Sequence, residues 1–287
     1  MENTDESDPS NLLKVLTDET RVGILEALAD AQRESPEDPH LSFSELRERV
    51  GTRDSGKFNY HLKRLRGSFI EKTDDGYGLT YTGRRIISSI LAGTYDEPEE
   101  TEAELDYDCT VCGEPLSMVY EEGVMEIKCE NDHTVQNFVS PGGVEDRTVD
   151  EILELMSLTT YHDLQLVHEG ICPMCHGKMG IDVKETEEWN LGYFVSATCT
   201  RCGMHSSTSL GSLVANHPAV VSFFYEHDVD VRKMPPWTLD FLTDTRATVE
   251  SHDPFRAVIK IEKDGSVLEL TVDSDLDVVG VERVERD

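Results

Sequence analysis

The sequence predicts an α+β protein, because three different patterns follow one another along its 287 residues. Apolar residues recur at helical spacing in residues 10–95, interrupted by one short hairpin pattern. Two sets of closely spaced cysteines follow, and near the C-terminus residues 255–263, 266–273 and 276–284 alternate apolar and polar side chains. We therefore expect a helical N-terminal domain, two small cysteine-containing modules with associated helices, and a C-terminal antiparallel β-meander.

The composition is strongly acidic, with 58 Asp and Glu against 26 Lys and Arg and a formal net charge of -32. The excess is spread along the chain, which is typical of halophilic proteins with solvated acidic surfaces. An acidic chain from an ordinary cell is the alternative. Such a charge disfavours nonspecific attraction to nucleic acid or anionic membranes, so any contact of this kind must be local.

No apolar run approaches the roughly 18–20 residues that a membrane-spanning helix needs. The first ten residues, MENTDESDPS, are acidic and lack the basic and apolar segments of a signal peptide. We therefore expect a cytoplasmic protein without membrane contact. In that compartment the seven Cys are better explained as metal ligands than as disulfide partners.

Composition also suggests where the domains begin and end. Residues 1–9 are polar and are expected to form a disordered tail. Residues 96–106, DEPEETEAELD, are expected to form an extended acidic linker, because like charges repel one another. The remaining chain divides into a helical domain at 10–95, cysteine modules at 107–168 and 169–230, and a β-meander at 231–287.

The helical domain has the element order of a winged helix, in which a helix-turn-helix is followed by a hairpin and a last helix. Residues that can cap helices precede the apolar faces, and Asp74-Asp75-Gly76 is a turn signal between two short strand patterns. The expected elements are helices beginning at Ser10, Asp18 and Ser44 and at Asp54 or Ser55, strands at 68–73 and 77–81, and a helix from Thr82 to Leu91.

The fourth helix concentrates positive charge in this acidic chain. Phe58, Leu62 and Leu65 recur at helical spacing and are expected to be buried. The other side chains then point outward, where they can donate to phosphates and base edges in the major groove of DNA. The expected DNA-binding residues are Lys57, Asn59, Tyr60, His61, Lys63, Arg64 and Arg66.

Two alternatives stay open in this domain. The basic helix face can be no more than a solvated surface, and His61 can be either a phosphate contact or a packed flanking residue. Asp74 and Asp75 at the hairpin tip would repel phosphate, so the hairpin is not expected to grip the DNA backbone strongly.

A resemblance to the ArsR-like winged-helix regulators, of the haloarchaeal type with a cysteine-containing C-terminal region, is carried by residues 12–28 (LLKVLTDETRVGILEAL), 42–51 and 58–66 (FNYHLKRLR). It covers about residues 10–93 and implies a homodimer paired through the first and last helices of the winged helix. Metal-sensing members hold ligands on the winged helix, but residues 1–108 contain no Cys, so metal sensing there is not expected. The residues that could serve dimerisation are Leu12, Leu13, Leu16, Ile86, Ile87, Ile90 and Leu91.

Seven Cys and one His form two sets of four possible metal ligands. Zinc favours tetrahedral sites of thiolate and imidazole ligands at such spacings. We expect two structural zinc ions, each within a zinc ribbon; reactive thiols or an iron–sulfur cluster are the alternatives. The expected ligands are Cys109, Cys112, Cys129 and His133 at the first site and Cys172, Cys175, Cys199 and Cys202 at the second.

Each cysteine module is expected to hold hairpin strands and to be followed by a helix, one with its apolar face from Val149 and one from Pro218. Small ribbons bury little apolar surface, so the metals and these helices are expected to complete their cores. A catalytic zinc is not expected, because protein ligands can fill both sites. A labile or regulatory role stays open for the spare histidines His162, His168, His176 and His205.

These expectations favour a site-specific transcriptional regulator that is not an enzyme. A homodimer would place residues 54–66 of each copy in the major groove of double-stranded DNA. A winged helix followed by a zinc ribbon also resembles archaeal transcription factor E, which implies instead a general transcription or protein-interaction factor that contacts the transcription machinery. Packing, dimerisation and effector binding all stay open as roles of the C-terminal meander.

Overall fold

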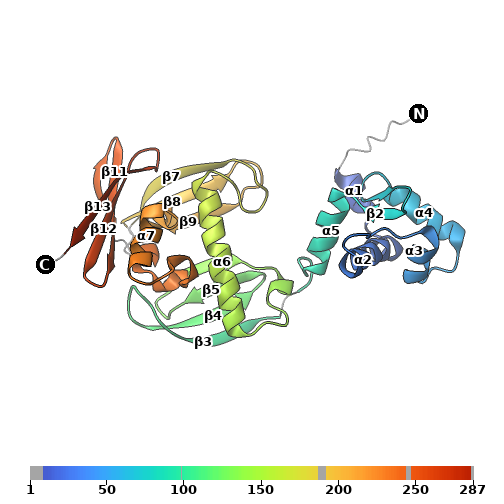
Figure 1. Cartoon of the computed structure of the whole chain (residues 1–287), viewed down its shortest axis with the longest axis horizontal. Helices are drawn as coiled ribbons and strands as arrows, with labels where there is room; N and C mark the ends of the chain where they lie inside the picture. The colour runs from blue at the N-terminus through green and yellow to red at the C-terminus, as the bar shows by residue number, and fades with distance from the viewer. Residues whose placement is uncertain (1–8, 98, 187–191, 244–246, 286–287) are drawn as a thin grey trace. The chain divides into compact units, whose positions relative to one another are not determined.

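The computed structural model describes residues 9–97, 99–186, 192–243 and 247–285 (Figure 1). They form a mixed α+β protein whose sheets are antiparallel. The chain divides into two compact units, Met1–Asp96 and Glu97–Asp287, which are described separately. Among the described residues, no helix combines the length and the apolar character needed to cross a membrane.

The first unit has helices and one two-stranded sheet, in the order expected from the sequence. The sheet joins β1 and β2 in antiparallel register, with Ile70 opposite Leu79. The elements are α1 (Pro9–Val15), α2 (Glu19–Glu34), α3 (Phe43–Arg49), α4 (Ser55–Leu65), β1 (Ile70–Lys72), β2 (Tyr77–Leu79) and α5 (Tyr81–Leu91).

The helix caps of this unit follow from short polar motifs. Asp18 caps α2 and Asp54 caps α4, as expected, and each carboxylate accepts two backbone N–H bonds. Helices α3 and α5 begin two residues earlier than expected, with Ser42 and Thr80 as their caps. At α3 the reason is a capping box, in which Ser42 and Glu45 satisfy each other's backbone N–H groups.

The buried face of α4 is the one predicted. Phe58, Leu62 and Leu65 are fully buried in a core that also contains Ile24 and Leu28 of α2. Burial of these apolar side chains holds α4 against α2. The opposite face of α4 is therefore turned toward solvent.

The second unit contains three sheets in which strands follow chain order, namely β3-β4-β5-β6, β7-β8-β9 and β10-β11-β12-β13 (Figure 1). Its strands are β3 (Thr101–Asp108), β4 (Pro115–Glu121), β5 (Val124–Lys128), β6 (Thr134–Phe138), β7 (Met179–Thr186), β8 (Gly192–Cys199), β9 (His205–Ser209), β10 (Ala247–His252), β11 (Phe255–Lys263), β12 (Ser266–Val272) and β13 (Val278–Glu285). Its helices are α6 (Val149–His168), α7 (Pro218–Glu226) and α8 (Asp240–Thr243), with 3-10 turns η1 (Pro141–Gly143), η3 (Leu210–Val214), η4 (Val231–Lys233) and η5 (Pro236–Thr238).

The acidic linker expected at 96–106 is wrong over most of its length. Residues Thr101–Asp108 form β3, which pairs with β4. Thr101, Ala103 and Leu105 are half-buried and alternate with exposed acidic residues, which is the period of a strand with one covered face. The boundary between the units falls after Asp96, where the acidic run begins.

The boundaries expected near residues 168 and 230 lie inside one packed unit. Helix α6 contributes Ile152 and Met156 to one core, together with Trp237. It contributes Tyr161 to a second core, which also holds residues of β8, α7, β11 and β12. The Tyr161 hydroxyl donates to the carbonyl oxygens of Val231 and Met234 at 3.0 and 3.1 Å. The cysteine modules and the C-terminal sheet therefore share α6 and these cores.

The C-terminal sheet has one more strand than the three-strand pattern expected. Strands β11, β12 and β13 lie where the alternation predicted them, and Asp264 and Gly265 take positive φ in the tight turn between the first two. Strand β10 (Ala247–His252) was not expected, and it pairs with β11 across a register shift between Val249 and Ser251. Its short, irregular pairing leaves a weak sequence pattern.

Candidate metal centres and nucleic-acid interface

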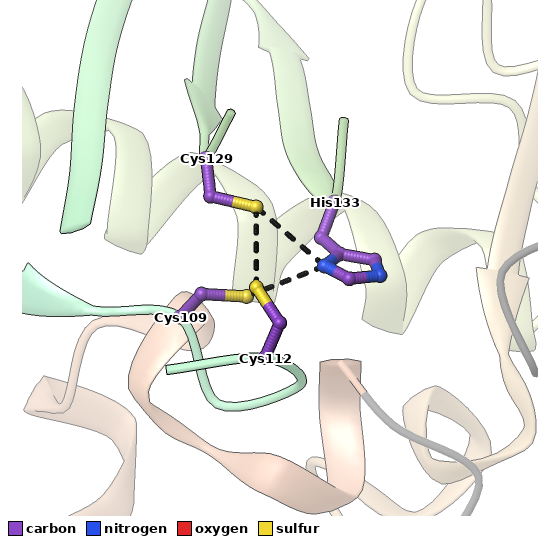
Figure 2. A group of neighbouring side chains, drawn as sticks. All are labelled: Cys109, Cys112, Cys129 and His133. Carbon is purple, nitrogen blue, oxygen red and sulfur yellow. Dashed lines mark hydrogen bonds between the residues drawn. The ribbon is translucent and has the colours of Figure 1, made fainter. Parts of the chain in front are cut away.

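The first cysteine cluster lies where two hairpin turns meet. Cys109 and Cys112 lie in the turn between β3 and β4, and Cys129 and His133 lie in the turn between β5 and β6. Figure 2 shows the three thiols and the imidazole pointing toward one another. All four ligand atoms lie within 4.8 Å of one another, so the predicted set is brought together as a group that could hold a metal ion.

The separations within this cluster are those of a tetrahedral ligand set. The Sγ atoms of Cys112 and Cys129 are 3.7 Å apart, and His133 Nδ1 lies 3.6 Å from Cys109 Sγ and 3.5 Å from Cys129 Sγ. Metal–ligand lengths of about 2.3 Å for sulfur and about 2.05 Å for nitrogen give tetrahedral edges of about 3.8 Å (S to S) and about 3.6 Å (S to N). The imidazole presents Nδ1 to the cluster.

A neighbouring amide supports the exposed thiol of this cluster. Asn131 Nδ2 donates to Cys112 Sγ at 3.5 Å, and this bond is the main cause that lowers the pKa of Cys112 to about 6. Burial, in contrast, raises the pKa of the Cys109 thiol. Asn131 was not singled out from the sequence, although its place between Cys129 and His133 is a signal that could have found it.

The second cluster has the same construction with four thiols. Cys172 and Cys175 lie in the turn before β7, Cys199 is the last residue of β8, and Cys202 lies in the turn between β8 and β9. Two of the sulfur pairs are 3.6 Å and 3.5 Å apart, and all four atoms lie within 4.8 Å of one another. This set also matches a tetrahedral site.

Backbone groups shape the turns of the second cluster. The N–H groups of Cys202 and Arg201 donate to Cys199 Sγ, and they lower the pKa of that thiol to about 6. A Cβ at Gly177 would lie 3.2 Å from Cys175 Sγ and 3.3 Å from Cys199 Sγ, which is closer than most real Cβ contacts. A glycine at this position therefore leaves room for the sulfurs.

The spare histidines do not complete either cluster. Among the described residues, the groups of His, Cys and acidic side chains that could hold a metal are the two sets above. His205 instead bonds Thr198 and Ser207, and His168 Nε2 lies 3.3 Å from the carbonyl oxygen of Leu276.

The outer face of α4 carries the predicted polar and basic side chains. Tyr60 is 58% exposed, and in the described part of the chain none of the four cations on this face forms an ion pair. The exposed residues of this face are Lys57, Asn59, Tyr60, Lys63, Arg64 and Arg66. A cationic surface without internal partners is available to a polyanion.

The expectation of a surface role for His61 is wrong. The side chain is buried, at 3% exposed, and its Nδ1 lies 3.3 Å from Asp18 Oδ1 at the N-terminus of α2. The alternative of a packed flanking residue is the one that the structure shows. A helical projection of α4 places His61 at the edge of the exposed face, but it does not reveal that α2 covers this edge.

The apolar residues considered for dimerisation divide into buried and exposed groups. Ile87 lies in the core at 2% exposed, so it is not free for a partner. Leu13 of α1 and Leu91 of α5 are 62% and 46% exposed. The remaining four, Leu12, Leu16, Ile86 and Ile90, are half-buried and pack against the core of the first unit.

Comparisons with protein-family models gave a match in each unit. Residues 9–90, which include α4, match the family described as Domain of unknown function (DUF7347). A search of curated proteins and a search of solved structures gave no match. Residues 106–278, which include both cysteine clusters, match the family described as Domain of unknown function (DUF7351). This match spans more than half of the chain, which therefore belongs to the family Domain of unknown function (DUF7351).

Proposed function

We propose that the protein is a site-specific, DNA-binding transcriptional regulator with two structural zinc sites. The observation that carries the proposal is the outer face of α4. It gathers unpaired cations, an amide and an exposed phenol on one helix of a chain whose net charge is -32. Attraction to DNA would then be local, because the chain as a whole carries far more acidic than basic residues.

The surrounding elements support a winged-helix assignment. Helix α3, a short turn and α4 are followed by the β1–β2 hairpin and α5, which is the order of a helix-turn-helix with a wing. Helix α4 would enter the major groove. Lys57, Lys63 and Arg64 would contact phosphates or guanines, and Asn59 and Tyr60 would reach base edges. The exposed Asp74 and Asp75 at the hairpin tip would keep the wing from gripping phosphate.

Two copies of the chain would present two such helices. Leu13 and Leu91 are exposed on α1 and α5, the helices through which the ArsR-like resemblance implies pairing. Covering two large apolar side chains favours association. A dimer would read two half-sites, with a spacing set by the distance between its α4 helices.

The metal in both clusters is proposed to be zinc in a structural role. Thiolate and imidazole ligands in tetrahedral sets of four favour zinc, and four protein ligands leave no position for a reacting water. Cys109 and Cys129 are buried and belong to the apolar core of the first module. Zinc would tie the two turns of each module together and so stabilise the hairpins between them.

The proposal is tested by a genome-wide map of bound DNA, followed by binding measurements on the fragments found, in molar KCl. Lys63→Ala/Arg64→Ala should weaken binding to these fragments at least tenfold, since good base or phosphate contacts are each worth about 1–3 kcal/mol. Lys233→Ala/Lys263→Ala is the matched control, because it removes the same charge from other elements.

Equal binding by the α4 variant and the control would refute the proposal. Crosslinking to RNA polymerase without sequence-selective DNA binding would also count against it. That outcome would favour a general transcription factor.

A further inference from the structure

The four thiols of the second cysteine cluster lie in two stretches of sequence without acidic residues. Residues 97–287 contain 40 Asp and Glu but 13 Lys and Arg. Even so, 170–181 and 189–225 contain no Asp or Glu, and these two stretches hold all four thiols of the second cluster. The turns of the first cluster differ, because acidic residues lie within two positions of their ligands, namely Asp108, Glu114, Glu130 and Asp132. The two clusters therefore differ in the charge of their surroundings.

Strand pairing places polar side chains of this region on one face. Both the N–H and the hydroxyl of Thr200 donate to the carbonyl oxygen of Lys178, each at 3.0 Å. Thr198 pairs with Gly180 on β7 and with His205 on β9. Paired residues, and residues two apart in a strand, share a face of the sheet. Lys178, Thr198 and His205 therefore lie on the same face, Thr200 lies in the turn that follows β8, and all four are exposed.

Arg201 adds a second cation beside this face. A Cβ at Gly177 would lie 3.1 Å from Arg201 Cβ, so the arginine borders the turn that carries Lys178. Arg201 and Lys178 are exposed, and neither forms an ion pair with a described residue. We call Lys178, Thr198, Thr200, Arg201 and His205 the second-site patch. Asp182 lies on the same face of the sheet, two residue pairs farther along β7 than the Gly180–Thr198 pair.

We propose that the second-site patch binds the phosphate backbone of double-stranded DNA, as a second contact of a chain whose α4 reads the sequence. This inference rests on the proposed function. Lys, Arg and hydroxyl side chains are the groups that proteins use most for phosphate contacts. Since both contacts belong to one chain, the second forms at the raised effective concentration that the first creates.

The cations of the patch could instead stabilise the metal site, and the test must distinguish this role from DNA binding. A zinc ion with four thiolates carries a net negative charge, and Lys178 and Arg201 would offset it. In that case their loss would weaken metal binding and leave the DNA affinity of the metal-loaded protein unchanged. Zinc content and DNA binding must therefore be measured on the same samples.

The experiment uses the full chain and the DNA fragments identified for wild type. The affinity of Lys178→Ala/Arg201→Ala for duplex DNA is measured over a range of KCl concentrations, beside the control Lys233→Ala/Lys263→Ala. We expect the variant to retain two zinc ions and to bind more weakly than the control. The slope of log affinity against log salt should become shallower by about 0.9 for each phosphate that the variant no longer neutralises.

Three outcomes would overturn the inference. The first is an affinity and a salt slope equal to those of the control. The second is zinc loss by Lys178→Ala/Arg201→Ala, together with normal DNA binding of a zinc-loaded Lys178→Gln/Arg201→Gln variant. The third is that Lys178→Ala/Arg201→Ala weakens binding of the chain to polyglutamate but leaves its binding to DNA unchanged. That result would assign the patch to an acidic protein. If Lys63→Ala/Arg64→Ala weakens DNA binding in the same series, the proposed function stands although this inference fails.

Discussion

The imidazole Nδ1 of His61 lies 3.3 Å from the carboxylate Oδ1 of Asp18, and this contact joins the inner side of α4 to the N-terminus of α2. The same Oδ1 accepts the backbone N–H bonds of Thr20 and Arg21 that cap α2. One carboxylate thus caps α2 and also contacts α4. The orientation of the α4 surface depends on a residue that does not belong to α4.

Replacement of the capping carboxylate should destabilise the first unit. Asp18→Ala removes both the cap of α2 and the contact with His61, and we expect a decrease of about 1–2 kcal/mol in its free energy of unfolding. Asp18→Ser should be destabilised less, because serine is also a good cap. Urea unfolding of the full chain, followed by a probe in the first unit, measures the difference. Equal decreases in the two variants would show that the cap contributes little.

The same carboxylate should make this unit sensitive to acid. Burial opposes the shift, but the charges of His61 and Arg21 and the backbone N–H bonds lower the pKa of Asp18 below its ordinary value of 3.8. A carboxyl whose pKa is lowered by folding stabilises the folded state at pH values above its unfolded-state pKa. This stabilisation is lost as the pH falls through the folded-state pKa. As the pH is lowered below 5, the thermal unfolding temperature of wild type should fall more steeply than that of Asp18→Asn. Parallel curves would contradict this.

The amide beside the first cluster should tune its metal affinity. Asn131→Leu removes the donor to Cys112 Sγ, and removal of such supporting bonds typically costs 10–100-fold in metal affinity. Competition with a chelator measures the change at the first site. Glu130→Gln is the matched control, because it alters an exposed neighbour in the same turn. An unchanged affinity in Asn131→Leu would mean that the bond has no such role.

Metal analysis should return two zinc ions per chain. Cys112→Ser should reduce this to one, because the second cluster shares no ligand with the first. Cys175→Ser should do the same at the other site. A content of zero in wild type, or an iron–sulfur absorption spectrum, would refute the zinc assignment.

A methyl group at Gly211 should destabilise the second unit. A Cβ at this position would overlap the backbone carbonyl of Phe241, so η3 and α8 would have to move apart. We expect Gly211→Ala to cost about 1–3 kcal/mol, as overpacking typically does. Gly180→Ala is the control, since its nearest neighbour would lie 4.0 Å away. Similar thermal unfolding of the two variants would contradict the close approach.

Local patterns predicted the features that depend on neighbours in sequence. The spacing of Phe58, Leu62 and Leu65 identified the buried face of α4, and the pairing of cysteines identified both ligand sets. Two of the features that were predicted wrongly depend on contacts with another helix or strand. His61 is covered by a helix some forty residues earlier in the chain, and β3 is a strand only because β4 lies beside it. An excess of carboxylates concealed the alternation of Thr101–Asp108.

The position of α6 restricts how this protein family could exchange its parts. The helix has 20 residues and is about 30 Å long, with one end in the core of the first module and the other in the core shared by the second module and the C-terminal sheet. Each half of α6 packs in a different core, so a cysteine module taken from another protein would have to bring the matching half of this helix. Recombination at residue 168 would separate α6 from one of the two cores that it helps to form. Both cores stay intact only if residues 97–287 are inherited together.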